Sequence, residues 1–262
     1  MKIGVFDSGL GGITVLKDLI LKYPYHEYFY YADLKNNPYG EKDYSELEKI
    51  GSNIINELEK VKVNECVCAC GTLSSISNSF IFNENNKIKQ VHNIIDPIVS
   101  YMDSSKNNSV LLLATPATIK KGVFENRIRE KYSNLKIYKE GCSEFVNIIE
   151  NNISDEEYIQ NTVNKYVEKY NGLIDTVILG CTHYILLEKY ILNRLPDIKI
   201  IDAGNAFVNL NKNKEWLEIK NIDNNQKENI VHIIMSDYRN NFEENCKKIL
   251  PSDCNLKFIV KQ

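Results

Sequence analysis

Short apolar runs alternate along this chain with longer segments whose apolar residues recur at the spacing of an amphipathic helix. This alternation is typical of an α/β protein with a mainly parallel sheet flanked by helices. The predicted strands are Lys2–Phe6, Glu27–Ala32, Asn64–Ala69, Val110–Ala114, Lys136–Tyr138, Thr176–Leu179 and Lys199–Ile201. The predicted helices are Gly12–Lys22, Tyr44–Val61, Thr72–Phe80, Gly122–Lys131, Asp155–Tyr170 and Leu186–Leu195.

Two crossings divide these elements into two predicted domains. Asp96 precedes Pro97, and a residue before proline disfavours the helical conformation, so we expect an extended crossing there. A second crossing near Asp202-Ala203-Gly204 returns the chain to the first domain. The predicted first domain comprises residues 1–95 and 205–262, and the second comprises residues 96–204. The predicted C-terminal elements are a helix from Asn205, the strand Ile230–Met235, a helix around Tyr238–Ile249 and the strand Leu256–Val260, with a polar, exposed excursion at Asn211–Glu228.

The bulk properties are those of an ordinary globular protein. The chain has 262 residues and a net charge of −3, which argues against a general nucleic-acid binder with a basic face. No apolar stretch approaches the roughly 20 residues that a membrane helix needs. Met1-Lys2 leads directly into the first apolar run, without a signal-peptide pattern. We therefore expect a cytoplasmic protein that binds neither nucleic acid nor membranes.

The seven cysteines are an odd number, spread through a chain too large to need disulfides, so we expect reduced thiols. Cys66, Cys68 and Cys70 alternate along a predicted strand, which points their side chains the same way. No paired Cys or His cluster follows at ligand spacing, so inert, buried thiols at positions 66 and 68 are favoured over a metal site.

Polar residues follow five of the predicted strands. In an open α/β sheet, ligands bind beyond the carboxyl ends of the strands. Exposure of the loops to solvent would account for a polar residue at any one of these ends. It accounts poorly for two thiols, so we expect the five strand ends to share one crevice. The strand ends are Asp7-Ser8, Asp33, Cys70–Thr72, Ala114-Thr115 and Cys181–His183.

The glycine-rich run Asp7–Gly12 invites a dinucleotide-loop interpretation, which two features oppose. Thr14 occupies the third glycine position of that fingerprint, and Asp7 would place a carboxylate beside the pyrophosphate. We favour glycines that let the backbone approach a small ligand, with Asp7 available to an ammonium group. A tight turn in which Ser8 caps the helix remains the alternative.

Cys70 and Cys181 each close an apolar run and precede small polar residues that could start a helix. Unpaired N–H groups and the helix dipole would lower the pKa of a thiol in that position. Thr72 and Thr182 add hydroxyl donors, and His183 can exchange a proton near neutral pH. The alternative is that each is a small buried hydrophobe. Two thiols facing one cleft suit a reaction that takes a proton from one face of a carbon and returns one to the other.

These residues resemble the glutamate racemases of the cofactor-independent amino-acid racemase superfamily. The run Ile3–Gly12 is similar to the family's N-terminal signature, and Asp33 with Pro38-Tyr39-Gly40 matches its Asp…Pro-Tyr-Gly block. The resemblance spans residues 1 to about 205. The other matching segments are Ala69-Cys70-x-Thr72, Leu179–Tyr184, Ala114-Thr115 with Thr118-Ile119, and Cys142 through Glu150.

The resemblance implies two similar α/β domains with the active site in the cleft between them, no cofactor, and a homodimer. It implies that Cys70 and Cys181 are the acid/base thiols, assisted by Asp7 and His183, with Asp33 and Glu150 as further assisting candidates. The residues implied to hold the substrate's carboxylates and ammonium are Ser8, Tyr39, Gly40, Gly71, Thr72, Thr115, Thr118 and Thr182.

Several positions depart from the family pattern. Gly71 stands where the family has asparagine, which removes a side-chain amide from the substrate contacts. The other departures are Leu34 for threonine, Lys121 for serine, and Ser143 and Ile185 for prolines. Despite these departures, the resemblance implies racemisation of L-glutamate to D-glutamate, supplying peptidoglycan synthesis. An aspartate racemase of the same superfamily and a catalytically silent amino-acid-binding relative remain alternatives.

Overall fold

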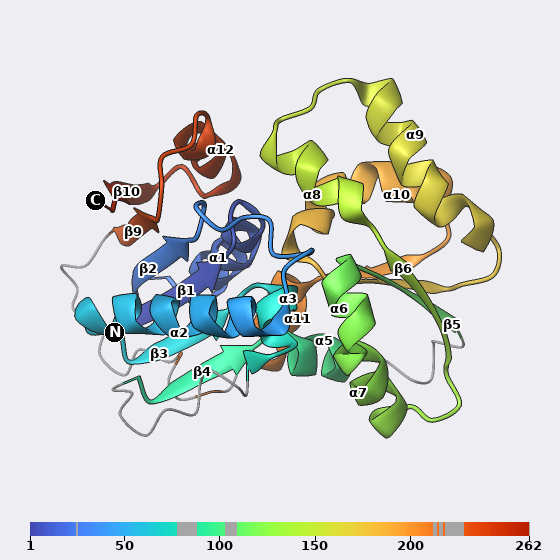
Figure 1. Cartoon of the computed structure of the whole chain (residues 1–262), viewed down its shortest axis with the longest axis horizontal. Helices are drawn as coiled ribbons and strands as arrows, with labels where there is room; N and C mark the ends of the chain where they lie inside the picture. The colour runs from blue at the N-terminus through green and yellow to red at the C-terminus, as the bar shows by residue number, and fades with distance from the viewer. Residues whose placement is uncertain are drawn as a thin grey trace.

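Two parallel sheets organise the chain (Figure 1). The structure is a computed structural model that describes residues 1–24, 26–77, 88–102, 109–211, 214, 217 and 228–261. The first sheet has the strand order β10-β9-β2-β1-β3-β4 and the second has the order β6-β5-β7-β8. Every strand pair within them is parallel, which confirms the predicted fold class.

The strands of the first sheet come from both ends of the chain. They are β1 (Lys2–Asp7), β2 (Glu27–Ala32), β3 (Glu65–Cys68), β4 (Gln90–Asn93), β9 (Asn229–Met235) and β10 (Cys254–Val260). The second sheet contains β5 (Ser109–Ala114), β6 (Lys136–Gly141), β7 (Thr176–Leu179) and β8 (Lys199–Ile201). Helices cover both faces of such sheets, and so central strands such as β5 and β7 are continuous apolar runs.

The α-helices connect and cover these strands. They are α1 (Gly11–Lys22), α2 (Tyr44–Lys60), α3 (Gly71–Ser74), α5 (Ile95–Tyr101), α6 (Pro116–Lys121), α7 (Val123–Lys131), α8 (Ser143–Glu150), α9 (Glu156–Val167), α10 (Glu188–Arg194), α11 (Ala203–Leu210) and α12 (Phe242–Ile249). Two 3₁₀ segments are η1 (Glu168–Tyr170) and η2 (Thr182–Leu187). Asp43, Asp155 and Asp202 each accept a backbone N–H as the N-cap of a helix, the usual role of this residue type. None of the helices described is long and apolar enough to cross a membrane.

The predicted strands are confirmed to within two or three residues at each end, but four elements were missed: β4, α5, α6 and α8. The extended crossing at Asp96-Pro97 is wrong, since both residues lie in the first turn of α5. The N–H groups of a first turn have no intrahelical partner, so a proline there removes no hydrogen bond.

Several predicted helices have different limits. The helix predicted over Thr72–Phe80 is α3, which ends at Ser74; residues 78–80 lie outside the described residues, as does most of the predicted excursion at Asn211–Glu228. Gly122, predicted inside a helix, has φ +69° and separates α6 from α7. Asn241, with φ +64°, immediately precedes α12, which is therefore shorter than predicted.

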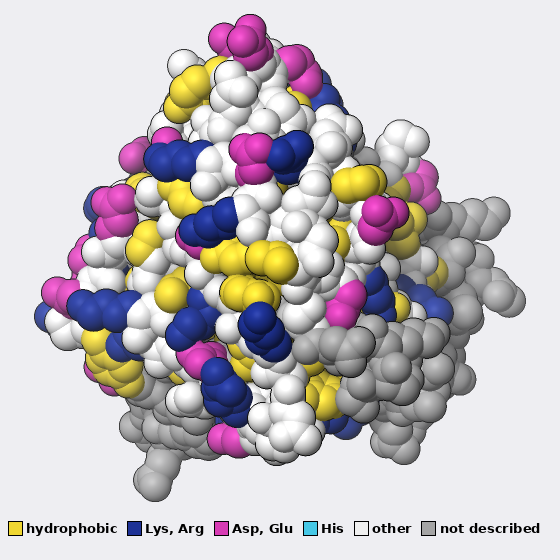
Figure 2. Space-filling model, turned by 90° about the vertical axis from the view of Figure 1, so that its right-hand side faces the viewer, with side chains coloured by type: hydrophobic (Ala, Val, Ile, Leu, Met, Phe, Trp, Pro, Cys, Tyr) yellow, Lys and Arg dark blue, Asp and Glu magenta, His cyan; other side chains and the backbone are white. Residues whose placement is uncertain are grey.

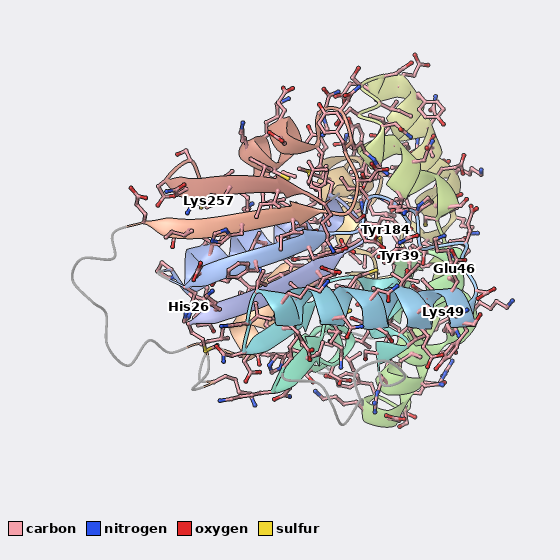
Figure 3. The ribbon with its side chains drawn as sticks, turned by 60° about the vertical axis from the view of Figure 1, so that its left-hand side comes forward. His26, Tyr39, Glu46, Lys49, Tyr184 and Lys257 are labelled. Atoms are coloured by element: carbon pink, nitrogen blue, oxygen red, sulfur yellow. The ribbon has the colours of Figure 1, made fainter. Side chains whose placement is uncertain are left out.

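Buried polar groups within the first sheet shape the loop after β1. The hydroxyl of Tyr30, a fully buried residue of β2, donates to the Gly9 carbonyl at 2.6 Å. Figure 3 shows Tyr39 and Tyr184 where the two halves of the molecule meet, whereas His26 lies toward the other end of the first sheet. His26 bonds the Leu217 carbonyl and takes no part in the junction.

The face shown in Figure 2 mixes acidic and basic side chains with scattered hydrophobic ones. No continuous basic patch covers the described part of that face, in keeping with the net charge of −3.

We predict that Tyr30→Phe lowers the free energy of unfolding by about 1–3 kcal/mol, because the buried Gly9 carbonyl loses its hydroxyl donor. Urea unfolding of the variant and the wild type measures this difference. Tyr158→Phe, at an exposed position on α9, is the matched control and should leave stability unchanged. Equal stability of Tyr30→Phe and the wild type would contradict the assigned role.

Candidate active site

The register of the two sheets brings polar strand ends to one place. In the first sheet Phe6 of β1 pairs with Cys68 of β3, so Asp7 and Cys70 emerge at the same edge. In the second sheet Leu113 of β5 pairs with Leu179 of β7, two residues before Thr115 and Cys181. The carboxyl edges of both sheets meet at a cavity of about 30 Å³.

Most of the residues singled out from the sequence line this cavity. They are Asp7, Ser8, Tyr39, Gly40, Cys70, Thr72, Thr115, Cys181, Thr182 and His183. Four others, Asp33, Gly71, Thr118 and Glu150, do not line it, and of these Glu150 lines a neighbouring groove. Lining residues that the sequence did not single out as site residues are Pro38, Glu41, Pro116, Cys142, Ser143 and Val146. Glu41 and Pro116 adjoin matched motifs, and the other four lie within them.

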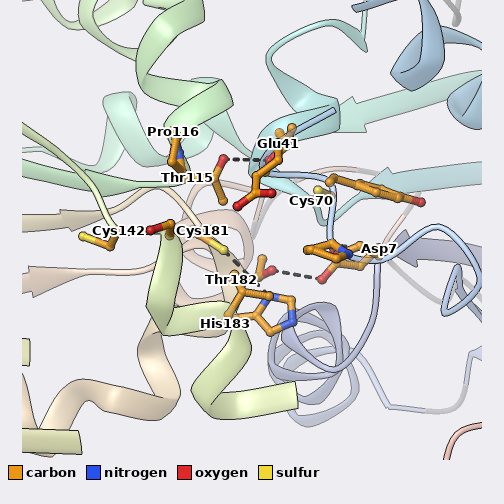
Figure 4. Close-up of a pocket in the computed structure, with 16 residues that line it drawn as sticks. Asp7, Glu41, Cys70, Thr115, Pro116, Cys142, Cys181, Thr182 and His183 are labelled. Atoms are coloured by element: carbon orange, nitrogen blue, oxygen red, sulfur yellow. Dashed lines mark hydrogen bonds between the residues drawn. The ribbon is translucent and has the colours of Figure 1, made fainter. Parts of the chain in front are cut away.

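Cys70 and Cys181 lie on opposite sides of the cavity, one from each sheet (Figure 4). The sulfur of Cys142 points away from the space between them. Cys70 precedes α3, but the expected lowering of its pKa by the helix is wrong. Burial raises the pKa of the Cys70 thiol well above its usual value, and the nearby Asp7 carboxylate adds to the rise. A helix of a single turn offers too little compensation for this loss of solvation.

Asp7 joins the two sheets at the base of the cavity. One carboxylate oxygen accepts the Ser8 N–H at 2.8 Å, and the other accepts the Thr182 hydroxyl at 3.0 Å. Burial raises the pKa of Asp7, while the neighbouring His183 and these two donors oppose the rise. Asp7 is therefore held between Cys70 on one side and the Cys181 loop on the other.

His183 lies between Cys181 and Glu150. Its Nδ1 atom is 3.7 Å from the Cys181 sulfur. Its Nε2 atom is 2.6 Å from Glu150 Oε1 and also lies 3.2 Å from the Gly11 N–H, which is directed at it. Burial by itself lowers the pKa of His183, but the bonds with Cys181 and Glu150 outweigh it and raise the pKa well above the usual range. This arrangement favours an imidazolium beside the Cys181 sulfur.

Glu150 ends α8 and is buried, which by itself would raise its pKa. Donation from His183, the Leu10 N–H and the positive charge of Arg239 outweigh burial and lower the pKa of Glu150 to about 2. Arg239 follows β9, where the sequence offered no motif. Its contact with Glu150 at 2.6 Å depends on the tertiary fold.

Three threonine hydroxyls form a hydrogen-bonded cluster beside the cavity, and two of them, Thr72 and Thr115, line it. The Thr72 and Thr115 hydroxyl oxygens are 3.0 Å apart, and Thr118 lies 3.3 Å and 2.9 Å from them. All three side chains are buried. Each hydroxyl can turn its proton from its neighbour toward an anion, so the cluster is suited to receive a carboxylate.

Asp33 supports the wall from behind. It accepts the Tyr39 hydroxyl at 2.6 Å and the Ser236 hydroxyl at 2.8 Å, and it does not reach the cavity. Tyr39 is thereby fixed with its ring on the cavity wall. The Gly40 carbonyl accepts the Ala117 N–H, and this hydrogen bond connects the loop to α6, which follows β5 of the second sheet.

The glycines of the N-terminal run make room for side chains of the site. A Cβ at Gly9 would lie 2.1 Å from Glu150 Oε1, one at Gly11 2.4 Å from His183 Nδ1, and one at Gly12 2.5 Å from the Asp7 Cβ. The N-cap of α1 is Leu10, so the alternative in which Ser8 caps the helix is wrong.

The departures from the family pattern lie in different places. A Cβ at Gly71 would lie 1.9 Å from the Gly180 carbonyl, so the backbones of the two cysteine loops are in direct contact there. Lys121 is outside the cavity lining and stacks on the Tyr44 ring at 3.8 Å, and Ser143 lines the cavity. Within the described residues, no group of three or more His, Cys, Asp or Glu side chains could hold a metal ion.

Comparison with known proteins gives the family of the chain. The family Asp/Glu/Hydantoin racemase matches residues 89–210. "Glutamate racemase 2" of Caldanaerobacter subterraneus subsp. tengcongensis is 32% identical over 98% of this chain and 96% of its own length. The glutamate racemase of Clostridium acetobutylicum is 33% identical over 84% of this chain and 86% of its own. The chain belongs to the Asp/Glu racemase family.

Solved structures support the same assignment. The glutamate racemase of Francisella tularensis, solved in complex with D-glutamate, has a TM-score of 0.84 and 26% identity over 99% of this chain and 97% of its own. That of Campylobacter jejuni has a TM-score of 0.83 and 28% identity over 95% of this chain and 97% of its own. An aspartate racemase of Picrophilus torridus shares the fold at a TM-score of 0.61 and 22% identity, over 80% of this chain and 93% of its own. The racemase family therefore accounts for nearly the whole chain.

We predict that Gly71→Ala lowers the free energy of unfolding by about 1–3 kcal/mol, because its Cβ would force two backbones apart. Urea unfolding measures the change. Gly122→Ala is a matched control with open space around the new Cβ, and its cost arises from the positive φ alone. If Gly71→Ala had the same free energy of unfolding as the wild type, the prediction would be wrong, because the two loops would separate without a cost in stability.

The pKa of Glu150 gives a second prediction. The pKa of Glu150 is about 2 in the folded protein, against 4.5 in the unfolded chain. Its ionised carboxylate therefore stabilises the fold above pH 4.5, and this stabilisation is lost as the pH falls toward 2. The stability difference between the wild type and Glu150→Gln should therefore shrink by up to about 3 kcal/mol over that range. Urea unfolding at pH 6, 4.5 and 3 tests this, and a difference that is constant with pH would contradict it. His183 is charged throughout the range in the wild type.

Proposed function

We propose that this protein interconverts L- and D-glutamate without a cofactor, using the thiols of Cys70 and Cys181 as the two acid/base groups. The observation that carries the proposal is the placement of two cysteines, one from each sheet, on opposite sides of one small cavity. Relatives named glutamate racemase, similar over nearly the whole chain, support glutamate as the substrate.

In the proposed reaction, a thiolate on one side takes the Cα proton as the C–H bond breaks. The thiol on the other side gives its proton to the opposite face of Cα, so a new C–H bond forms with inverted configuration. The first cysteine ends as a thiol and the second as a thiolate, ready for the reverse direction. Only protons are transferred, so the step needs neither an oxidant nor a reductant.

The electrostatics support distinct starting states for the two sulfurs. Burial and Asp7 raise the pKa of Cys70, which favours its thiol form at neutral pH. His183, held as an imidazolium by Glu150, is 3.7 Å from the Cys181 sulfur and stabilises negative charge there. We propose that Cys181 starts as the base and Cys70 as the acid in one of the two directions.

Fixed donors would stabilise the charge that builds up on the substrate carboxylate as Cα loses its proton. The Thr72, Thr115 and Thr118 cluster, together with Ser8 and Thr182, is proposed for the two carboxylates, and Asp7 for the ammonium. Tyr39 and Gly40 would close one wall, and Gly71 would contribute only its backbone.

A cavity of about 30 Å³ holds one or two water molecules and is too small for an amino acid. A groove of about 620 Å³ adjoins it and shares Pro38, Glu41, Ser143 and Val146 with its wall. We propose that substrate enters from this groove as the two sheets separate, and that closure expels water before proton transfer.

The decisive experiment is incubation of the protein with L-glutamate in D₂O. We expect decay of the circular dichroism signal and appearance of D-glutamate that carries deuterium at Cα. Cys70→Ser and Cys181→Ser should each lower turnover by a factor of about 100 or more, since each loss removes one proton route. Cys254→Ser, on β10 and away from the cavity, is the control. Absence of both decay and exchange would overturn the proposal.

Aspartate is the second candidate substrate, and Gly71 is the observation in its favour. The side-chain amide that the family places there is absent, and one methylene of fit is worth only about 1–3 kcal/mol. The same assay with L-aspartate decides between the two substrates. Binding of either amino acid without exchange would instead indicate a silent relative.

We also propose that the two domains are residues 1–95 with 205–262 and residues 96–204, and that the protein is a cytoplasmic homodimer supplying D-glutamate for peptidoglycan. Strands of the first sheet lie at residues 2–93 and 229–260, and those of the second at 109–201, which supports these limits. The mass in solution from light scattering tests the dimer.

A further inference from the structure

Arg239 lies behind the Cys181 side of the cavity, in the segment between β9 and α12. Its Nη1 donates to Oε2 of Glu150 at 2.6 Å, and its Nη2 donates to the Leu34 carbonyl at 3.1 Å. The Arg239 side chain is 30% exposed, against 7% for that of Glu150. A planar guanidinium bound to two acceptors at once is held in one orientation.

The other oxygen of Glu150 leads to the thiol. Oε1 accepts the Leu10 N–H at 2.8 Å and lies 2.6 Å from His183 Nε2, and His183 Nδ1 is 3.7 Å from the Cys181 sulfur. The four side chains thus form a continuous line, Arg239–Glu150–His183–Cys181. Arg239 is attached to the first sheet's side, and the other three residues belong to the second.

Glu150 needs this support because of its position. It is the last residue of α8, where the helix dipole disfavours negative charge, and it is nearly buried. Among the described residues, Arg239 is the donor to Oε2. Glu150 and Arg239 both line the groove of about 620 Å³, so without Arg239 the carboxylate could turn toward water there.

We propose that Arg239 is a positioning residue for the proton transfer at Cys181: it holds Glu150 so that Glu150 fixes His183 against the sulfur. This inference rests on the proposed racemase function. It adds a residue that neither the sequence motifs nor the cavity lining includes.

The first experiment follows the titration of His183 by NMR in protein labelled with ¹⁵N-histidine. The chain has four histidines, and the His183 signal is the one absent from His183→Asn. Three titratable groups face this imidazole: Glu150 from α8, Cys181 from its own loop, and Asp7 from β1. The Gly11 N–H, at the start of α1, is also directed at its Nε2. Simple removal of the Arg239 cation would raise the pKa of His183. Loss of the Glu150 contact would lower it.

The proposal therefore expects the pKa of His183 to fall by about one pH unit or more in Arg239→Gln. Arg239→Lys keeps one cationic donor but loses the second bond, so a smaller fall is expected. Arg129→Gln is the matched control, because it removes an exposed ion pair with Glu125 on α7. That control should leave the titration unchanged.

The second experiment measures racemisation of the same variants. Arg239→Gln should lower kcat by about 10- to 100-fold, since small misplacements of catalytic groups cost this much, with KM changed by less than about threefold. Added to Glu150→Gln, it should change kcat by less than about twofold, because Arg239 acts through Glu150.

An unchanged or raised pKa of His183 in Arg239→Gln would overturn the proposal, as would full additivity with Glu150→Gln. If Arg239→Gln does not fold, the same readouts on Arg239→Lys decide. A wild-type protein that racemises neither amino acid would end the proposed function, while the NMR titration would still test the Arg239–Glu150–His183 arrangement.

Discussion

The arrangement of the site depends on two buried carboxylates that take donors from both sheets. Asp7 ends β1 and accepts the Thr182 hydroxyl from the loop after β7, and Glu150 ends α8 and accepts the Leu10 N–H from the loop after β1. A buried carboxylate that loses a partner is costly, so these contacts hold the sheets in one relative position. The placement of Cys70 opposite Cys181 follows from that position.

The same carboxylates give the two thiols different surroundings. Asp7 is next to Cys70 and adds to the effect of burial, whereas Glu150 acts through His183 and brings positive charge near Cys181. One sulfur therefore faces an anion and the other a cation, although both follow similar strands. This asymmetry suits a pair in which one member gives a proton while the other takes one.

Close backbone packing makes such an arrangement feasible. Gly9, Gly11 and Gly12 leave space for Glu150, His183 and Asp7, and Gly71 lets the two cysteine loops touch. A glycine-rich loop after a first strand usually indicates an approaching ligand. Here side chains of the protein lie against the glycines, and the same sequence pattern is compatible with both arrangements.

The sequence by itself determined the alternation of strands and helices and the polar strand ends, because both are local patterns in a chain with buried parallel strands. It missed β4, α8 and Arg239, whose places depend on contacts between distant segments. The sequence also predicted a lowered pKa for Cys70, whereas the structure raises it, because a one-turn helix cannot offset burial. Only the tertiary structure decided three features: the burial of the site residues, the pairing of Glu150 with His183 and Arg239, and the contact at Gly71. Each of them depends on two sheets that meet edge to edge.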